Sequence, residues 1–352
     1  MSMDVRVFGR QKDGLEVDCC TLKNKNGMSA EFLTYGCRVA KLYVPGKNRK
    51  SENVVLGHDT VAEYEAPSDV LGAVIGRYAN RIGGAQFHIG EKVYHLAKNE
   101  GPNILHSAPV GWQNCVWRIK CSNNDDDAPS VTFAYHSPDG ESGFPGNVDA
   151  EVTYTLTTDN ALMIEYRART DAETPLSLTN HTYFNLTGDS SKSVLSQELQ
   201  IFADSVTETD GGLIPTGKLL PVAGTALDFR KPKAVGQDIR SQLPSIRDCG
   251  GYDHNFALGA SKGSRKAAEL YDEASGRRML VFTDMPGVQL YTANSFGPGA
   301  KASGGVPLKP HRAVCLETQY YPDSVNRPEF PYENLKPEEP FHSTTIYKFI
   351  VE

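Results

Sequence analysis

Long hydrophobic runs are missing from this sequence. No stretch of its 352 residues approaches the roughly 18 consecutive apolar residues that a membrane-spanning helix needs. The opening residues, MSMDVRVFGR, also lack the apolar core and the small-residue cleavage site of a secretory signal peptide. We therefore expect a protein of the cytoplasm that has no membrane partner.

An excess of positive charge is missing as well. The chain carries 36 Lys and Arg against 43 Asp and Glu, which gives a formal net charge of -7. Proteins that bind nucleic acid need a basic surface to neutralise phosphates. The charge balance therefore predicts no nucleic-acid partner and is typical of a water-soluble protein.

Cysteine is sparse and is not arranged for zinc or redox chemistry. The seven cysteines are odd in number and scattered, and none belongs to a CxxC pair. We interpret them as reduced and mostly buried thiols, as expected in the cytosol. They are Cys19, Cys20, Cys37, Cys115, Cys121, Cys249 and Cys315.

Motifs of the common cofactor-dependent reactions are absent too. There is no HExxH, no GxxxxGK[ST] and no GxGxxG between a strand and a helix. Residues 259–263 match GxSxG, but they lie in a polar stretch without the strand-to-helix context of a nucleophile elbow. We interpret that match as chance and expect neither a metal nor another cofactor.

Strand patterns, in contrast, are abundant. Short runs rich in Val, Ile, Thr, Tyr and Phe alternate with polar residues and end at Gly, Asn or Asp. Hairpin turns are predicted at Asn26-Gly27, at 158–160 and at Ser275-Gly276. The predicted strands are 5–8, 30–35, 131–136, 151–157, 162–169, 199–203, 279–283 and 346–351.

Helical patterns are rare, and the candidates are short segments at 60–65 and 235–243. Strands and helices do not alternate regularly, which argues against doubly wound and barrel-type parallel sheets. We predict an all-β fold, a large antiparallel β-sandwich with few short helices, in which residues 1–352 form a single domain. Surface loops are predicted at the polar stretches 122–129, 259–265 and 296–310.

Six segments carry ionisable or amide side chains in otherwise apolar, strand-like surroundings, where a functional site is expected. Glu317 interrupts an apolar run, and a carboxylate there is ion-paired, exposed or functional, because unpaired burial is costly. Taken alone, His181 is more typical of a hydrogen-bonded core or surface histidine, and Asp253 is more typical of a turn residue. The segments are 76–82, 103–106, 179–186, 251–256, 287–291 and 315–319.

Taken together and in this order, the segments resemble the aldose 1-epimerase (galactose mutarotase) family. The resemblance rests on GRYANRI, an LH pair, NHTYFNLTG, DHNF, GVQLYT and LETQYYPDSVN, with GFPG at 143–146 in addition. It covers nearly the whole chain and implies a galactose mutarotase-like supersandwich whose curved sheet forms a sugar cleft. It also implies a cofactor-free enzyme that interconverts the α and β anomers of free hexoses such as D-galactose and D-glucose.

The resemblance implies a role for each residue that matches the family's motifs. Glu317 corresponds to the general base and His181 to the general acid. Opening the pyranose ring needs both, because a base takes the C1 hydroxyl proton while an acid protonates the ring oxygen. Substrate contacts are implied for Asn80, Arg81, His106, Asp253 and Gln289.

The ordinary pKa values suit these roles only in part. Glu, with a pKa of about 4.3, is ionised at neutral pH, whereas His, at about 6.5, must be held protonated by neighbours such as Asp253 or by the sugar. Tyr183, Phe184 and Trp112 are candidates for stacking on a sugar face, with core packing as the alternative.

One departure from the family is visible, because Ser107 and Ala108 follow His106 where the family usually has two glycines. The loop beside His106 is therefore expected to differ, and a non-catalytic sugar-binding protein on the same scaffold is an alternative function.

A further alternative keeps the chemistry but takes a hexose 6-phosphate, with Arg77, Lys98 and Arg312 as candidate phosphate ligands. The residues do not rank galactose against glucose or other aldoses. As a partner we expect a small-molecule aldose, with no nucleic acid and no membrane, and the chain itself as a monomer or weak dimer.

Overall fold

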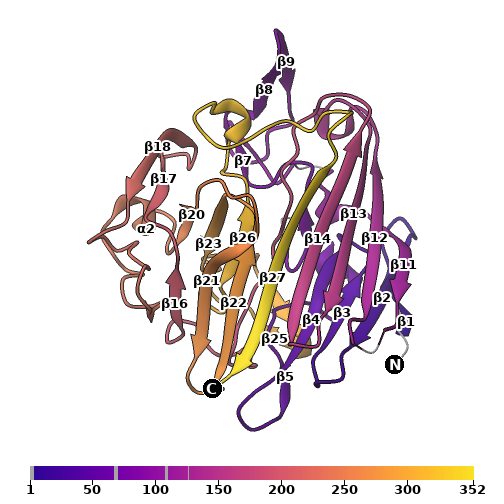
Figure 1. Cartoon of the computed structure of the whole chain (residues 1–352), viewed down its shortest axis with the longest axis vertical. Helices are drawn as coiled ribbons and strands as arrows, with labels where there is room; N and C mark the ends of the chain where they lie inside the picture. Colours follow the sequence, from indigo (N-terminus) through magenta and orange to yellow (C-terminus); the bar gives the residue numbers. More distant parts are fainter. Residues whose placement is uncertain (1–3, 67–69, 108–109, 126) are drawn as a thin grey trace.

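The largest sheet of the protein is antiparallel and has nine strands (Figure 1). The computed structural model describes residues 4–66, 70–107, 110–125 and 127–352. In spatial order, the strands are β11 (Arg118–Asn123), β12 (Ser130–Ser137), β13 (Val148–Leu156), β14 (Ala161–Thr170), β27 (Phe341–Val351), β22 (Arg277–Thr283), β21 (Arg265–Asp272), β16 (Glu198–Ile201) and β19 (Lys233–Ala234).

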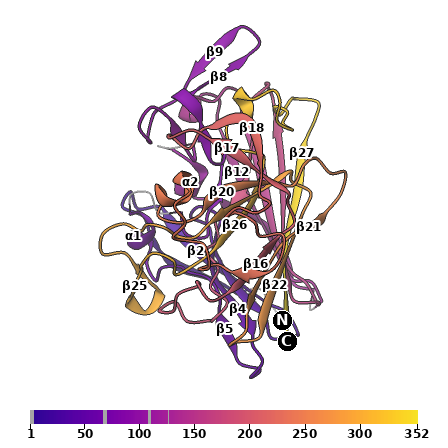
Figure 2. The same ribbon diagram turned by 90° about the vertical axis from the view of Figure 1, so that its left-hand side faces the viewer.

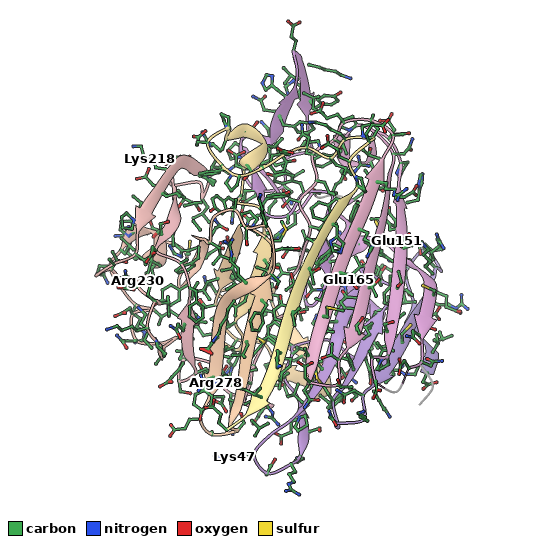
Figure 3. The ribbon with its side chains drawn as sticks, viewed as in Figure 1. Lys47, Glu151, Glu165, Lys218, Arg230 and Arg278 are labelled. Carbon is green, nitrogen blue, oxygen red and sulfur yellow. The ribbon has the colours of Figure 1, made fainter. Side chains whose placement is uncertain are left out.

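Alternating side chains divide this sheet into a buried and an outer face. In β13, Val148, Ala150 and Val152 are buried, whereas the residues between them are exposed or half-buried. Glu151 and Glu165 lie on the outer face of the sheet (Figure 3). The period-2 pattern of the sequence therefore corresponds to a sheet with one face in the core.

Two five-stranded antiparallel sheets form the rest of the sandwich. Figure 2 shows β27 and β21 at one side of the molecule, with β20 and β26 beside them. One sheet has the order β1 (Asp4–Arg10), β2 (Glu16–Lys23), β3 (Ser29–Leu33), β4 (Arg38–Pro45) and β5 (Ser51–Asn53). The other, called the central sheet below, has the order β18 (Pro215–Pro221), β17 (Ser205–Thr209), β20 (Asp253–Ala257), β23 (Gly287–Tyr291) and β26 (Cys315–Gln319). The predicted antiparallel sandwich is confirmed.

Short two-stranded ribbons and single helical turns join the sheets. The ribbons pair β6 (Val74–Ile75) with β15 (Thr179–Asn180), β7 (Arg81–Ile82) with β10 (Ile104–Leu105), β8 (Gln86–Ile89) with β9 (Lys92–His95), and β24 (Lys301–Ala302) with β25 (Val306–Pro307). The 3-10 turns are Gly83–Ala85, Trp112–Asn114, Glu141–Gly143, Ser303–Gly305 and Ser324–Asn326.

Two α-helices, α1 (Val61–Tyr64) and α2 (Pro244–Arg247), occur in the described ranges. The helix predicted at 60–65 is confirmed, and its first turn is closed by a reciprocal capping box between Thr60 and Glu63. The helix predicted at 235–243 is wrong, because Val235 and Gly236 donate their backbone N–H groups to Gln197 and Leu195. Neither α1 nor α2 has the length or the apolar character of a membrane span.

The loop predictions hold only in part. Residues 296–310 contain β24 and β25, and Ala302 packs in a buried cluster while Ser303 donates its N–H to Gly57. Of the other two stretches, 122–123 belongs to β11 and Arg265 begins β21. These strand pairings occur within polar stretches, so an alternation of apolar and polar side chains does not reveal them in the sequence.

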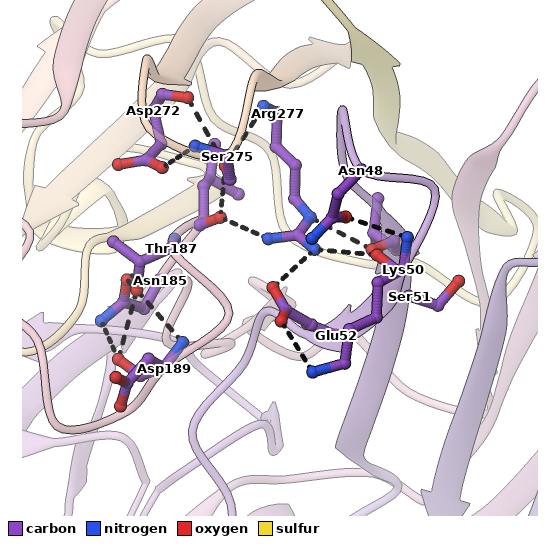
Figure 4. A network of polar contacts seen from close by, with 12 residues as sticks. Asn48, Lys50, Ser51, Glu52, Asn185, Thr187, Asp189, Asp272, Ser275 and Arg277 are labelled. Atoms are coloured by element: carbon purple, nitrogen blue, oxygen red, sulfur yellow. Dashed lines mark hydrogen bonds and ion pairs between the residues drawn. The ribbon is translucent and has the colours of Figure 1, made fainter.

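A buried arginine joins the nine-stranded sheet to the five-stranded sheet of β1 to β5 (Figure 4). Arg277 of β22 is 0% exposed, and its guanidinium donates to the carbonyls of Val44 and Leu186 and to Oε2 of Glu52, at 3.1, 3.0 and 3.0 Å. A buried cation is tolerated when acceptors surround it. The contact fixes the two sheets of the sandwich against each other.

Candidate active site

The inner strands of the central sheet present a polar face. Asn255, Gln289 and Glu317 lie side by side on β20, β23 and β26, and Asp253, Tyr291 and Cys315 form the next row. Successive residues of a strand point to opposite faces, so these side chains share one face while Leu316 and Thr318 point to the other. Thr318 contacts Thr345 and Leu316 accepts from the Tyr347 hydroxyl, so the opposite face packs on β27.

Glu317 is buried on this polar face, with 2% of its surface exposed. Its Oε2 has no hydrogen-bond partner among the described residues. Burial raises the pKa of Glu317 well above its usual range, Asp253 adds to the increase, and Arg81 opposes it. A carboxylate with a raised pKa is a stronger base than a solvent-exposed one, as proton abstraction near neutral pH requires.

His181 faces Glu317 from the segment that follows β15. Its Nε2 lies 3.6 Å from Oε1 of Glu317. Tyr183 stacks on the imidazole with ring centroids 4.9 Å apart and planes 12° from parallel. An antiparallel bridge between Phe184 and Val314 holds this segment against the strand that carries Glu317. The structure thus brings together the two residues that the sequence offered as acid and base.

Of the three aromatic candidates for sugar stacking, only Tyr183 lies beside this pair. Phe184 is fully buried against Tyr347, with ring centroids 4.8 Å apart. Trp112 is also fully buried, and its indole N–H donates to Glu141 at 3.2 Å. Phe184 and Trp112 therefore pack in the core and do not line the site.

Arg81 is held between two carboxylates at the edge of the cluster. Its Nε and Nη2 donate to the two oxygens of Glu100 at 2.7 and 2.8 Å, and its Nη1 lies 3.6 Å from Oδ2 of Asp253. Burial alone would lower the pKa of Arg81, but Asp253 and Glu100 outweigh it and raise the pKa. Gln289 donates from Nε2 to Oδ1 of Asp253 at 2.6 Å. Arg81, Asp253 and Gln289 are thus fixed as one polar group next to Glu317.

His106 is fixed as a neutral imidazole by the backbone of Asn80. The N–H of Asn80 donates to Nδ1 of His106 at 3.1 Å, and the N–H of His106 donates to the carbonyl of Asn80 at 3.1 Å. A ring nitrogen that accepts carries no proton, so the proton resides on Nε2. Burial and the charges of His181 and Arg81 lower the pKa of His106 well below its usual range. Its ring lies edge-on to His181, with centroids 5.5 Å apart.

Ser107 stabilises the loop that differs from the family pattern. His106 and Ser107 both have positive φ, of 54°. The Ser107 hydroxyl accepts from the N–H of Tyr78 at 2.8 Å and donates to the carbonyl of Tyr78 at 3.0 Å. The left-handed backbone that glycine would adopt at low cost is here secured by a side chain. Ala108, the other half of the departure, lies outside the described residues.

The prediction that Arg77 contributes to a phosphate-binding rim is wrong. Arg77 is buried, and its guanidinium donates to Ser137 and to the carbonyls of Pro138, Pro145 and Gly146. Burial lowers its pKa to about 10. The GFPG segment at 143–146 therefore supplies acceptors to an internal arginine, because a buried guanidinium is tolerated only where acceptors compensate for its lost hydration.

His254 of the DHNF segment is a structural histidine. Its Nδ1 accepts from the N–H of Asp253 at 3.0 Å, and its Nε2 lies 2.8 Å from the hydroxyl of Ser245 in α2. Burial lowers its pKa to about 4, although Asp253 opposes the effect. It neighbours Asp253 in sequence but points to the opposite face of β20.

Three polar residues near the site were not predicted. Glu100, the bidentate partner of Arg81, lies in a polar turn that carries no motif. Asn255 and Gln319 share the polar face with Asp253 and Glu317, and a two-residue spacing along each strand is the signal that points to them. Within the described ranges, no group of three or more His, Cys, Asp or Glu is arranged to hold a metal.

Comparisons with known proteins show the family of the chain. The model of the family described as aldose 1-epimerase matches residues 18–348. The galactose mutarotase of Mus musculus is 41% identical over 324 residues, covering 92% of each chain, and that of Homo sapiens is 40% identical over 347 residues, covering 99% of this chain and 94% of the relative. The crystal structure of galactose 1-epimerase from Lactobacillus acidophilus superposes with a TM-score of 0.87 at 28% identity, covering 100% of this chain and 99% of that one. The chain therefore belongs to the aldose 1-epimerase family.

Proposed function

We propose that this protein interconverts the α and β anomers of free hexoses such as D-galactose and D-glucose, with Glu317 as general base and His181 as general acid. The observation that carries the proposal is the buried pair itself, with Nε2 of His181 3.6 Å from Oε1 of Glu317. The hydroxyl on C1 and the ring oxygen are bonded to the same carbon. Two adjacent groups can therefore serve both oxygens at once.

The reaction then needs only proton transfers. Glu317 takes the proton of the C1 hydroxyl, the bond between C1 and the ring oxygen breaks, and the ring oxygen takes a proton from His181, which leaves an aldehyde at C1. After rotation about the C1–C2 bond, the freed hydroxyl adds to the other face of the aldehyde. It returns its proton to His181, and the new C1 hydroxyl recovers a proton from Glu317.

The surrounding residues orient the sugar in this proposal. Arg81 and Asn80 offer donors to neighbouring hydroxyls, and Asp253 and Gln289 offer further acceptors. His106, neutral with its proton on Nε2, donates to one sugar oxygen. Because Glu100 holds Arg81 through two hydrogen bonds, the guanidinium keeps its direction in the absence of substrate.

Polarimetry of freshly dissolved α-D-galactose at neutral pH, in the presence of EDTA, tests the proposal. The protein is expected to accelerate mutarotation. Glu317→Gln and His181→Asn are each expected to lose about 10²- to 10⁴-fold in rate, which is the usual contribution of a positioned proton-transfer group. Circular dichroism and thermal unfolding establish that the variants are folded. Wild-type rates in both folded variants would refute the assignment.

The same assay separates the alternatives. Calorimetric binding of galactose without acceleration would indicate a sugar-binding protein. Faster anomerisation of glucose 6-phosphate than of glucose would indicate a phosphosugar enzyme. We favour the free hexose because Arg77, one of three candidate phosphate ligands, is buried and donates from Nη1 and Nη2 to internal carbonyl and hydroxyl acceptors.

We also propose that residues 1–352 act as one domain, as a cytoplasmic monomer or weak dimer. The family match over residues 18–348 supports a single domain, and the seven free cysteines support a reducing compartment. Limited proteolysis would test the first point, and sedimentation over a range of concentrations would test the oligomeric state.

A further inference from the structure

Beyond Glu317, the polar face of the central sheet continues into a group of buried side chains that the proposed reaction does not use. We call Thr179, Asn255 and Gln319 the buried polar cluster. They are 0%, 2% and 0% exposed. Both amide atoms of Asn255, both of Gln319 and the hydroxyl oxygen of Thr179 have no hydrogen-bond partner among the described residues.

Strand register brings these residues together behind the base. Gln319 lies two residues beyond Glu317 on β26, and Asn255 lies opposite Gln289, which lies opposite Glu317. Phe184 and Val314 form an antiparallel bridge. If the same register is extended along both segments, His181 lies opposite Glu317 and Thr179 lies opposite Gln319. The 3.6 Å approach of His181 to Glu317 agrees with that register.

A glycine leaves room in the middle of the cluster. Gly287 lies opposite both Gln319 and Ala257 in the sheet. A Cβ atom at Gly287 would come within 2.5 Å of Oδ1 of Asn255, 2.9 Å of the Tyr321 ring and 3.2 Å of the Gln319 carbonyl. The side chain of Asn255 therefore leans over Gly287 toward β26, into space that any other residue at this position would fill.

Leaving these atoms unpaired is costly. A buried polar group without a partner destabilises the folded state by roughly 1–3 kcal/mol, and native proteins usually satisfy such groups with protein atoms or ordered water. Oε2 of Glu317 and Oε1 of Gln289 are two further unpartnered acceptors on the adjoining row. A water that accepts from an amide N–H₂ and donates to such acceptors makes the roughly three hydrogen bonds that are typical of a buried water.

We propose that the buried polar cluster binds ordered water that donates a hydrogen bond to Oε2 of Glu317. Thr179, Asn255 and Gln319 are then positioning residues, which act on the reaction through that water. This inference rests on the proposed function of Glu317 as the base.

The cluster answers a difficulty that Glu317 poses. Burial and the charge of Asp253 favour the protonated carboxyl, which is inactive as a base, and Arg81 opposes them. Hydrogen bonds donated to the carboxylate favour its ionised form. Water held by the amides supplies such a donor from the side away from the sugar.

The other ionisable groups around Glu317 come from several strands and loops. Asp253 on β20 and Arg81 on β7 face it, with Glu100 paired to Arg81. His181 and the neutral His106 lie on the proposed sugar side. Burial and Glu317 raise the pKa values of Cys315 on β26 and Tyr347 on β27, and Tyr291 on β23 lies in the next row of the polar face.

The test uses variants that remove the polar atoms with little change of shape, namely Gln319→Met, Asn255→Leu and Thr179→Val. The acidic limb of the pH profile of kcat/KM is expected to move up by about one pH unit in Gln319→Met and Asn255→Leu, because a hydrogen bond to a charged group contributes about that much. Thr179→Val is expected to shift the limb less, because it removes one hydroxyl. Gln319→Asn, which keeps the amide, is expected to restore the wild-type limb.

Ser343→Ala is the matched control. Ser343 on β27 is also buried with an unpartnered hydroxyl, but β27 packs behind β26, on the side away from Glu317. Its pH profile should equal that of the wild type. If Gln319→Met and Asn255→Leu fold and their acidic limbs stay in place, the cluster is packing only and the inference is wrong.

A second measurement separates this inference from the proposed function. The infrared difference between wild type and Glu317→Gln, recorded across pH, reports the protonation of the Glu317 carboxyl without any turnover. Its midpoint is expected to rise in the Gln319→Met background. A wild type that lacks mutarotase activity would refute the function, whereas an unmoved infrared midpoint would refute the water site.

Discussion

The two faces of the central sheet are equally buried at β26 but differ in how their polar groups are satisfied. On the face toward β27, the hydroxyls of Thr318 and Thr345 bond to each other, and the Tyr347 hydroxyl donates to the carbonyl of Leu316 at 2.9 Å. On the other face, Glu317 and Gln319 keep polar atoms that have no hydrogen-bond partner among the described residues. Along β26, buried polar groups on one face therefore have hydrogen-bond partners, whereas those on the other face lack them.

This difference in hydrogen bonding distinguishes the face that stabilises the fold from the face that is available for function. A satisfied buried pair stabilises the sandwich and offers nothing to a ligand, whereas an unsatisfied one costs stability until a ligand or water completes it. Functional sites are expected where a protein tolerates such a cost. Every unpartnered side-chain atom of β26 belongs to Glu317 or Gln319, on the face that His181 covers.

The largest expected effect is that of Glu317→Gln. Mutarotase activity should fall by about 10²- to 10⁴-fold. Stability at pH 8 should instead rise, by about 1–3 kcal/mol, because the variant no longer buries an ionisable group that lacks a partner. Urea unfolding monitored by circular dichroism measures the second effect.

The pH dependence of that gain has a definite sign. The folded-state pKa of Glu317 is raised, so folding takes up a proton and wild-type stability falls as pH rises from the unfolded pKa of about 4.3 through the folded value. The advantage of Gln should therefore be present at pH 8 and absent near pH 4. An equal advantage at both pH values would contradict the assignment of the raised pKa.

The sequence predicts the sandwich better than it predicts the contacts of the site. Alternation of apolar and polar residues predicts a strand at 162–169, and in β14 buried and outer side chains alternate from Leu162 to Arg169. Where the pairing is short or the backbone bonds to distant strands, as at 235–243, local patterns fail. The family motifs select Glu317 and His181, but their 3.6 Å approach depends on the register between segments over a hundred residues apart.

The two arginines of the GRYANRI motif illustrate the same limit. Arg77 and Arg81 are four residues apart, and both were candidates for ligand contacts. Arg81 meets Glu100 and Asp253 at the site, whereas Arg77 is enclosed by acceptors from 137–146 and by Thr174. Most acceptors of Arg77 are backbone carbonyls, which any residue provides, so the sequence contains no signal for them.

A second prediction concerns Asp253→Asn. Asp253 raises the pKa of Glu317, so its neutral replacement should move the acidic limb of kcat/KM to lower pH, opposite to the shift expected for Gln319→Met. KM should rise by about 10- to 100-fold, because Arg81 and Gln289 lose a charged partner. Polarimetry at several pH values and sugar concentrations checks both, and an upward shift of the limb would contradict the electrostatic argument.

A smaller effect is expected on the satisfied face. Thr318→Val leaves the Thr345 hydroxyl buried without its partner and should cost about 1–3 kcal/mol of unfolding free energy. The double variant Thr318→Val, Thr345→Val removes both groups and should recover most of that loss. Urea unfolding of the four proteins of the cycle measures the coupling, and additive losses would mean that the two hydroxyls do not depend on each other.

The smallest expected effect is that of Tyr347→Phe, which removes one hydroxyl from the satisfied face directly behind Glu317. The loss of its hydrogen bond to Leu316 should cost about 1 kcal/mol in urea unfolding. Activity and the acidic limb of kcat/KM should stay unchanged, because the phenol is neutral at working pH, its pKa being raised by burial and by Glu317. A shifted limb would show that the hydroxyl dipole acts on Glu317 through the strand. The satisfied face would then contribute to the chemistry as well as to stability, and the separation between the two faces would fail.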